Sequence, residues 1–255
     1  MRTVQQRLAG LHALHLQLPL SGMARRWRRC SRRLRGKKAR GLQSIRLPQT
    51  SWRHVTCARS PRLLDTVKVN GNVRNTELAI LSAVASELQV GDSLFEIGTF
   101  DGRTTINLAA ASLRDCEVHT LDLPPDLEPA YALDSGERHM VDKPESGQRI
   151  RAWREVGAPF TARIHQHFGD SATFDYTPFE QRCGLVFVDG SHARDYVLSD
   201  TYAAFRMLRP GGMVLWHDYG IWQDVTDTLD ELAERERLDL RCIRGTSLVY
   251  WRKPQ

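Results

Sequence analysis

The sequence predicts an α/β fold with a mostly parallel sheet, helices on both faces of that sheet and an antiparallel hairpin at the C-terminus. Short apolar runs alternate along residues 75–252 with segments whose apolar residues recur at helical spacing. A glycine turn joins the first of these runs directly to a helix, and five runs end in glycine, aspartate or His-Asp. Alternation of strands and helices is typical of parallel sheets that are covered on both faces.

The elements are expected in a regular order. A cap-type residue, Asn75, begins a helix that continues to about residue 88 and ends before Gly91. Strands are expected at 93–97, 118–122, 164–168, 185–188 and 213–216, further helices at 103–113, 147–156, 196–208 and 225–237, and a hairpin formed by 238–243 and 247–251. Residues 124–160 are rich in Pro, Gly and charge, which predicts an irregular insertion around its one helix.

The charge distribution divides the chain in two. Residues 1–64 hold 16 of the 36 Lys and Arg and no acid, whereas the rest has a net charge of −10. We therefore expect a basic, disordered extension over residues 1–61 and one domain over residues 62–255. The extension is interpreted in three ways: as a solvated tail, as an arm attracted to nucleic acid or an anionic membrane, or as an organellar transit peptide.

Composition excludes several classes of protein. No run approaches the roughly 18 apolar residues of a membrane span, so a transmembrane segment is not expected. The five cysteines are scattered and form no Cys-x-x-Cys pair, which argues against a disulfide framework or a zinc site. This pattern favours a reducing compartment, and we expect a cytoplasmic protein. No signal in the sequence specifies an oligomeric state.

The segment Glu96–Gly102 reads Glu-Ile-Gly-Thr-Phe-Asp-Gly and predicts a strand, a turn and a helix start. A dinucleotide-binding turn needs a glycine where Phe100 stands, so that the backbone can approach a pyrophosphate. No Gly-Lys-Ser/Thr follows either, and both kinds of phosphate-binding loop are therefore disfavoured.

This segment instead resembles the first motif of the class I S-adenosylmethionine-dependent methyltransferases, which have a Rossmann-like sheet. Asp122 stands where that family has its ribose-binding acid, and Gly169-Asp170-Ser171 resembles its segment beside the adenine. The stretches 187–192, 208–212 and 216–219 resemble one subgroup, the small-molecule O-methyltransferases of the macrocin and cephalosporin hydroxylase-like type. The resemblance covers about residues 75–252.

The resemblance implies a cofactor site for S-adenosylmethionine. It implies that Gly98 and Gly102 let the turn approach the methionine part, that Glu96 holds the methionine ammonium through water, and that Asp122 accepts from the ribose hydroxyls. The full implied set is Glu96, Gly98, Thr99, Phe100, Gly102, Asp122, Leu123, Asp170, Ser171 and Asp189. For a single acid of this set, such as Asp170, a purely structural role is the alternative.

The resemblance also implies methyl transfer to an oxygen of a small-molecule acceptor. Asp189 and Asp218 end neighbouring strands, so they could share one divalent cation such as Mg²⁺. The subgroup has metal ligands at the positions of Asp189, His217 and Asp218, and His217 departs from the acid that is common there. Asp189 and His192 are the predicted catalytic residues, with His192 as general base or as an orienting group.

Alternatives remain open beside this hypothesis. Tyr219 and Trp222 are interpreted either as walls of the acceptor pocket or as packing aromatics. A nucleic-acid-directed methyltransferase, or a binding protein guided by the basic arm, is the alternative function. A cofactor-binding fold with lost or altered chemistry is a third hypothesis, since fold does not fix function.

Overall fold

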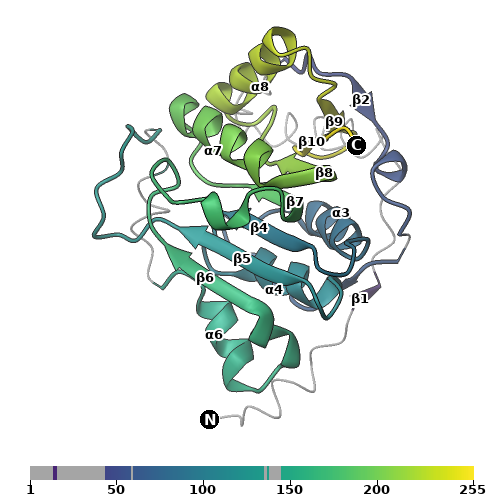
Figure 1. Cartoon of the computed structure of the whole chain (residues 1–255), viewed down its shortest axis with the longest axis vertical. Helices are drawn as coiled ribbons and strands as arrows, with labels where there is room; N and C mark the ends of the chain where they lie inside the picture. Colours follow the sequence, from purple (N-terminus) through teal and green to yellow (C-terminus); the bar gives the residue numbers. More distant parts are fainter. Residues whose placement is uncertain (1–13, 16–43, 59, 135–136, 138–144) are drawn as a thin grey trace, which may run out of the picture.

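A computed structural model of the chain describes residues 14–15, 44–58, 60–134, 137 and 145–255. Its centre is an eight-stranded sheet with the order β2-β9-β10-β8-β7-β4-β5-β6 (Figure 1). The strands are β2 (Gln49–Thr50), β4 (Ser93–Ile97), β5 (Glu117–Asp122), β6 (Ile164–Phe168), β7 (Cys183–Val188), β8 (Leu208–Trp216), β9 (Arg241–Ile243) and β10 (Val249–Arg252). A separate pair joins β1 (Leu14–His15) and β3 (Arg62–Leu63).

Strand directions confirm the predicted class. The run β8-β7-β4-β5-β6 is parallel throughout, and β10 pairs antiparallel with both β8 and β9. The mostly parallel sheet and its C-terminal antiparallel hairpin are therefore as the sequence predicted. Four of the five predicted apolar runs both start and end within two residues of their strands; the fifth ends with its strand, β8, which begins five residues earlier, at Leu208.

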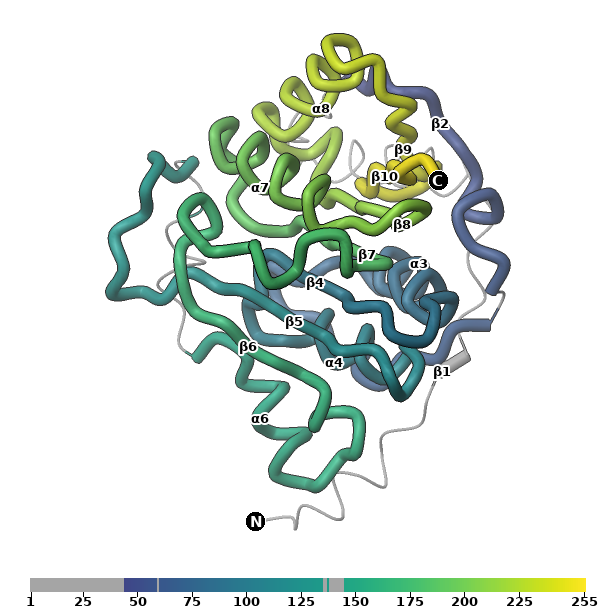
Figure 2. Tube along the Cα trace, viewed as in Figure 1, coloured from purple at the N-terminus to yellow at the C-terminus, as the bar shows by residue number. Residues whose placement is uncertain are grey.

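Helices cover both faces because the strand residues alternate between them. Leu94 and Leu185 belong to one core cluster together with helix residues such as Ile106, whereas Phe95 and Val186 belong to the other together with helix residues such as Leu229. Figure 2 shows how the helices surround the strands. The helices are α3 (Asn75–Ala85), α4 (Arg103–Ala111), α6 (Gln148–Glu155), α7 (Arg194–Met207) and α8 (Gln223–Arg235), with short 3-10 turns at Trp52–His54, Pro159–Arg163 and Thr177–Phe179.

The strand order reverses at β4. The chain moves outward from β4 through β5 to β6, then returns to the other side of β4 with β7 and continues through β8. In open parallel sheets, ligands bind outside the carboxyl ends of the strands at such a switch point. The topology therefore places a candidate site at the ends of β4 and β7.

Residues 44–58 are part of the folded body, which the sequence did not indicate. Here β2 pairs parallel with β9 and extends the sheet, and the side chains of Leu47, Trp52 and Val55 are buried. The expected disorder of residues 1–13 and 16–43 falls outside the described residues. The boundary at residue 61 stays a prediction, although residues 44–58 pack on the domain that follows it.

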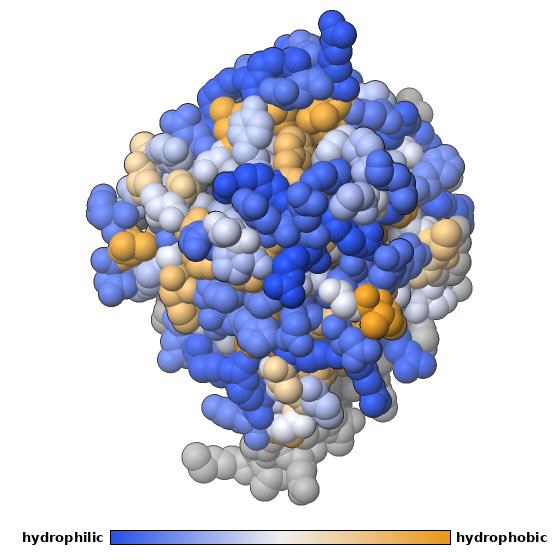
Figure 3. Space-filling view, viewed as in Figure 1, coloured by the Kyte–Doolittle hydropathy of each residue, from blue (hydrophilic) through white to orange (hydrophobic). Residues whose placement is uncertain are grey.

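One face of the molecule is predominantly polar. Figure 3 shows one face of the molecule on which hydrophilic residues surround small, separate hydrophobic areas. Among the described residues, no helix combines the length and the apolar character that crossing a membrane requires.

Candidate active site

The predicted acids meet at one edge of the sheet. Gly98, Asp189 and His217 directly follow β4, β7 and β8, and Asp122 ends β5. Backbone hydrogen bonds continue past the strands and join these ends. The amides of Gly98, Asp189 and His217 donate to the carbonyls of Leu121 (2.8 Å), Ile97 (2.9 Å) and Val188 (3.1 Å), respectively. The structure thus brings the turn and the acids into one continuous rim.

Both glycines of the turn are required by packing inside the protein. Gly98 has a φ of +103°, and an added Cβ would overlap the backbone carbonyl of Asp189. Gly102 has a φ of +84°, and its Cβ would lie 2.7 Å from Ile150 Cγ1 on α6. The resemblance implied that these glycines admit the cofactor. The structure adds a different reason, because other segments of the same protein, at Asp189 and Ile150, already occupy the space that a side chain would need.

The residues between the glycines shape the turn. Phe100 adopts a φ of +50°, and its ring lies against Gly71. Thr99 is buried, and its hydroxyl pairs with the hydroxyl of Thr120 at 2.7 Å. Their backbones face the rim, while their side chains fasten the turn to its surroundings.

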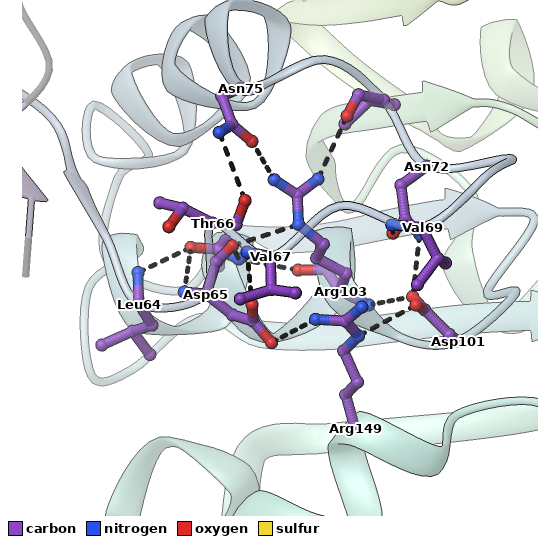
Figure 4. A network of polar contacts seen from close by, with 12 residues as sticks. Leu64, Asp65, Thr66, Val67, Val69, Asn72, Asn75, Asp101, Arg103 and Arg149 are labelled. Atoms are coloured by element: carbon purple, nitrogen blue, oxygen red, sulfur yellow. Dashed lines mark hydrogen bonds and ion pairs between the residues drawn. The ribbon is translucent and has the colours of Figure 1, made fainter. Parts of the chain in front are cut away.

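An ion-pair network holds this turn against α6. Asp101 accepts hydrogen bonds from Asn72 (3.0 Å) and Arg149 (2.9 Å), and Arg149 also pairs with Asp65 (Figure 4). Arg103 is fully buried and donates to the carbonyls of Asp65 and Val73, both at 3.1 Å. The segment before α3, the turn and α6 are therefore connected by charged hydrogen bonds, which are stronger than neutral ones.

Glu96 is a fully buried acid beneath the turn. Its Oε2 accepts from the hydroxyls of Thr105 and Thr120, the latter at 2.7 Å. Its Oε1 is buried and accepts no hydrogen bond from the described residues. Burial raises the pKa of Glu96 to about 8 despite the two hydroxyl donors. A buried acceptor without a partner is costly, so this oxygen is suited to a bound donor.

Asp122 has a related environment. Burial raises its pKa to about 6, although the Ser146 hydroxyl and the amides of Phe100 and Leu123 donate to it. Leu123 therefore contributes to the rim through its backbone. Like Glu96, Asp122 is surrounded by neutral donors.

Asp170 and Ser171 have structural partners. Asp170 accepts from the amides of Ala130 (2.6 Å) and Ala172 (2.8 Å) and from the Tyr196 hydroxyl (2.7 Å). Burial raises the pKa of Asp200 to about 7, although the Ser171 side chain opposes the rise. The pair orders the loop after β6, and its contact with adenine stays a prediction.

Asp189, His217 and Asp218 form a cluster in which one ligand atom from each lies within 4.8 Å of the others. His217 Nδ1 is 2.8 Å from Asp189 Oδ1 and 3.3 Å from Asp218 Oδ1. Burial opposes the imidazolium, but the two carboxylates raise the pKa of His217 well above its usual range. Burial would raise the pKa of Asp218, but its contacts with His217 and His192 keep that pKa low. At Asp189 the effect of burial is larger than that of His217, and the pKa is raised.

These three residues fit a divalent cation. Two carboxylate oxygens and one imidazole nitrogen are common metal ligands, and two of the three distances equal those between ligands of one ion, about 3 Å for bonds of about 2.1 Å. His217 Nδ1 is buried and makes close ionic contacts without an aligned hydrogen bond. That geometry is the one expected of ligands that converge on a shared point.

His192 is held between two acids. Its Nε2 lies 2.7 Å from Asp218 Oδ2, its Nδ1 contacts Glu137, and its ring stacks on Trp222 with centroids 4.1 Å apart. Burial would lower the pKa of His192, but Asp218 and Glu137 raise it to about 9. His192 therefore favours the imidazolium form at neutral pH, and it can act as a base only after this imidazolium has released a proton.

The sequence did not single out Glu77 and Glu137. Glu77 stands in the first turn of α3, where an acid is ordinary, and Glu137 belongs to the aperiodic insertion. Tyr219 is a packing residue: its hydroxyl accepts from the amides of Arg46 and Leu47, both at 3.0 Å, and donates to Asp230 at 2.6 Å. Of the two aromatic residues considered for the acceptor pocket, only Trp222 contacts the cluster.

Comparison with known proteins agrees with this geometry. Residues 95–219 match the model of a family described as a methyltransferase domain. Catechol O-methyltransferase B of Danio rerio is 29% identical over 183 residues, which are 71% of this chain and 61% of that protein. The chain thus spans less than two thirds of the length of this relative.

Solved structures show the same fold. The O-methyltransferase NovP superposes with a TM-score of 0.52 at 19% identity, covering 70% of this chain and 80% of NovP. The SAH-bound Podospora anserina methyltransferase PaMTH1 gives a TM-score of 0.54 at 15% identity, covering 73% and 81%. Together with the family match over residues 95–219, these findings confirm the predicted resemblance to class I methyltransferases.

Proposed function

We propose that this chain transfers a methyl group from S-adenosylmethionine to an oxygen atom of a small-molecule acceptor, assisted by a divalent cation. The observation that supports it best is the pairing of two unlike sites along one rim. Glu96 and Asp122 offer acceptor oxygens with neutral partners, and the Asp189–His217–Asp218 cluster lies directly beside them on β7 and β8. Such a rim binds a cationic cofactor and an ion next to each other.

The cofactor side binds and orients. When bound, S-adenosylmethionine supplies a methyl group on a sulfonium, which an oxygen nucleophile displaces in line. Glu96 Oε1 would accept a hydrogen bond from the ammonium group, directly or through water, and Asp122 would accept from the ribose hydroxyls. Asp170 and Ser171 would border the adenine, and the backbone from Thr99 to Gly102 would line the methionine part.

The cation side prepares the acceptor. A bound divalent ion acts there as a Lewis acid that lowers the pKa of a hydroxyl group. Asp189, His217 and Asp218 would hold it. His192 lies with Nε2 2.7 Å from Asp218 Oδ2, and after its imidazolium has released a proton to solvent, the neutral ring would accept the proton of the acceptor hydroxyl.

A small-molecule acceptor is favoured over a nucleic acid. The acidic balance of residues 65–255 opposes contact with a polyanion, and the relatives Catechol O-methyltransferase B and NovP are both named as O-methyltransferases. A role of the basic extension in binding nucleic acid or an anionic membrane stays a prediction, as does a cytoplasmic location.

Calorimetry with S-adenosylhomocysteine on the full chain tests the proposal. We expect binding at one site per chain, weakened about tenfold or more in Asp122→Asn and unchanged in the exposed control Asp239→Asn. Methyl transfer is then measured with a panel of phenols and sugars with and without EDTA. A folded protein that binds no S-adenosylhomocysteine would refute the proposal.

A further inference from the structure

In the Asp189–His217–Asp218 cluster, the imidazole ring of His217 has a further carboxylate partner, Glu77. His217 Nε2 lies 3.3 Å from Glu77 Oε2, on the side of the ring opposite the two aspartates. Glu77 is fully buried at the start of α3. This contact joins the first helix of the domain to the end of β8 across 140 residues of sequence.

Glu77 is itself held as a carboxylate. Its Oε1 accepts from the amide and the hydroxyl of Ser247, at 2.8 and 2.9 Å, and its Oε2 accepts from the amide and Nε of Arg74, both at 2.9 Å. Because a fixed carboxylate accepts a hydrogen bond from Nε2–H, that proton stays on Nε2, and Nδ1 is the nitrogen that would exchange its proton for an ion between Asp189 and Asp218.

The donor set then decides which ion suits the site. Mg²⁺ prefers oxygen ligands and retains several waters, whereas imidazole nitrogen is preferred by transition-metal ions such as Zn²⁺ and Fe²⁺. A carboxylate hydrogen-bonded to the far nitrogen of a ligating histidine also raises the basicity of that ligand. The imidazole ligand and its raised basicity both favour a transition-metal ion at this site.

We propose that the Asp189–His217–Asp218 site prefers a divalent transition-metal ion to Mg²⁺, with His217 Nδ1 as a ligand and Glu77 as the residue that orients it. This deepens the proposed function, since it names the class of ion at the same site. Glu77 is a positioning residue, because it acts only through His217.

Titration of the full chain with Mn²⁺, Zn²⁺ and Mg²⁺ tests this proposal, after treatment with a chelator and in the presence of S-adenosylhomocysteine. We expect Zn²⁺ to bind at least about tenfold more tightly than Mg²⁺, with the affinity of Mn²⁺ between the two. His217→Asp should remove most of this preference. Glu77→Gln should weaken Mn²⁺ binding about 10- to 100-fold, the usual effect of removing such a partner.

The pulsed EPR spectrum of bound Mn²⁺ gives a readout independent of catalysis. A nitrogen coupling is expected in the wild type and should be absent in His217→Asp. Because His119 Nδ1 and His167 Nε2 lie 3.2 Å apart on β5 and β6, they could also bind transition metals, so all titrations are repeated in His167→Gln. Arg74→Met serves as the second control, since it removes another partner of Glu77 without touching His217.

Equal or tighter binding of Mg²⁺ by the wild type would overturn the proposal, as would bound Mn²⁺ without nitrogen coupling. If Glu77→Gln does not fold, the comparison of the wild type with His217→Asp still decides it. A chain that binds Mn²⁺ as expected but shows no methyl transfer would refute the proposed function and leave the ion preference standing.

Discussion

The two halves of the rim use the same residue types in opposite electrostatic states. On the cofactor side, formed by β4 and β5, Glu96 and Asp122 accept only from hydroxyls and amides, and burial raises their pKa values to about 8 and about 6. On the cation side, formed by β7 and β8, Asp218 lies between His192 and His217, and its pKa is lowered despite burial.

The two halves therefore differ in the charge that a ligand would have to bring. Within the part of the chain that the structure describes, the hydrogen-bond partners of Glu96 and Asp122 are hydroxyls and amides, and none carries a positive charge. A ligand with an ammonium or sulfonium group would supply that charge. The cation side carries its own positive charges on two imidazoles, which a metal ion would have to displace or share. An acid at the end of a strand therefore identifies a ligand only together with its partners.

The largest expected effect is that of Asp218→Asn. It should reduce turnover about 100-fold or more while S-adenosylhomocysteine affinity changes less than about threefold, because it removes a proposed ligand of the ion and a partner of His192. Asn tolerates the φ of +63° at this position, so the backbone should be kept. Steady-state kinetics and calorimetry measure the two effects, with the exposed Asp195→Asn as control. Unchanged turnover would show that the cation side has no part in the reaction.

A comparison of Gly98 with Gly91 tests whether close packing between the ends of β4 and β7 requires the glycine at position 98. Gly98 and Gly91 both have positive φ values, but an added Cβ overlaps Asp189 only at Gly98 and meets nothing within 4 Å at Gly91. Gly91→Ala should cost the conformational strain alone, about 1–2 kcal/mol. Gly98→Ala should cost clearly more in urea unfolding without cofactor, and weaken cofactor binding as well. Equal losses in the two variants would contradict the steric explanation.

The pH dependence of cofactor binding distinguishes the halves further. The pKa of Glu96 is raised to about 8, so the native protein retains a proton that the unfolded chain releases near pH 4.5. Its contribution to stability is therefore largest at low pH and falls as pH rises between these values. A ligand ammonium favours the carboxylate, so S-adenosylhomocysteine affinity should increase from about pH 6 to about pH 8.

Calorimetry in buffers of different ionisation enthalpy should detect proton release on binding, and Glu96→Gln should abolish both the release and this pH dependence. An affinity that falls over the same range in the wild type would show that Glu96 does not face the ammonium.

The smallest effect concerns Tyr219, which follows Asp218 in the chain but belongs to neither half. Tyr219→Phe removes a hydroxyl that contacts Leu47 and Asp230, and we expect a loss of about 1–2 kcal/mol in unfolding free energy. The KM for the acceptor should stay unchanged. A clear increase in that KM would return Tyr219 to the acceptor pocket.

Sequence reasoning located the rim because its physics is local. Apolar runs define buried strands, and the carboxyl ends of parallel strands necessarily share one edge, so Asp122, Asp189 and Asp218 could be placed together without a structure. The mostly parallel sheet and its hairpin followed from the same periodicities.

The partners of those acids could not be predicted, because they come from distant positions with no pattern of their own. Glu77 contacts Ser247 across 170 residues, and the contact depends on how α3 docks against the loop before β10. The two-residue strand β2 is too short to show alternation, and it pairs with β9 through backbone atoms. Residues 44–58 therefore resembled a continuation of the basic extension.

The contact between Gly98 and Asp189 affects how related sequences are to be interpreted. Because the carbonyl of Asp189 fills the space of a side chain at position 98, the fold itself excludes every other residue there. A descendant that had lost methyl transfer would still retain this glycine for as long as β4 and β7 stayed paired. Its presence in a gene is therefore a marker of inherited architecture, and an inactive homologue would be recognised by changes at Glu96 or Asp218.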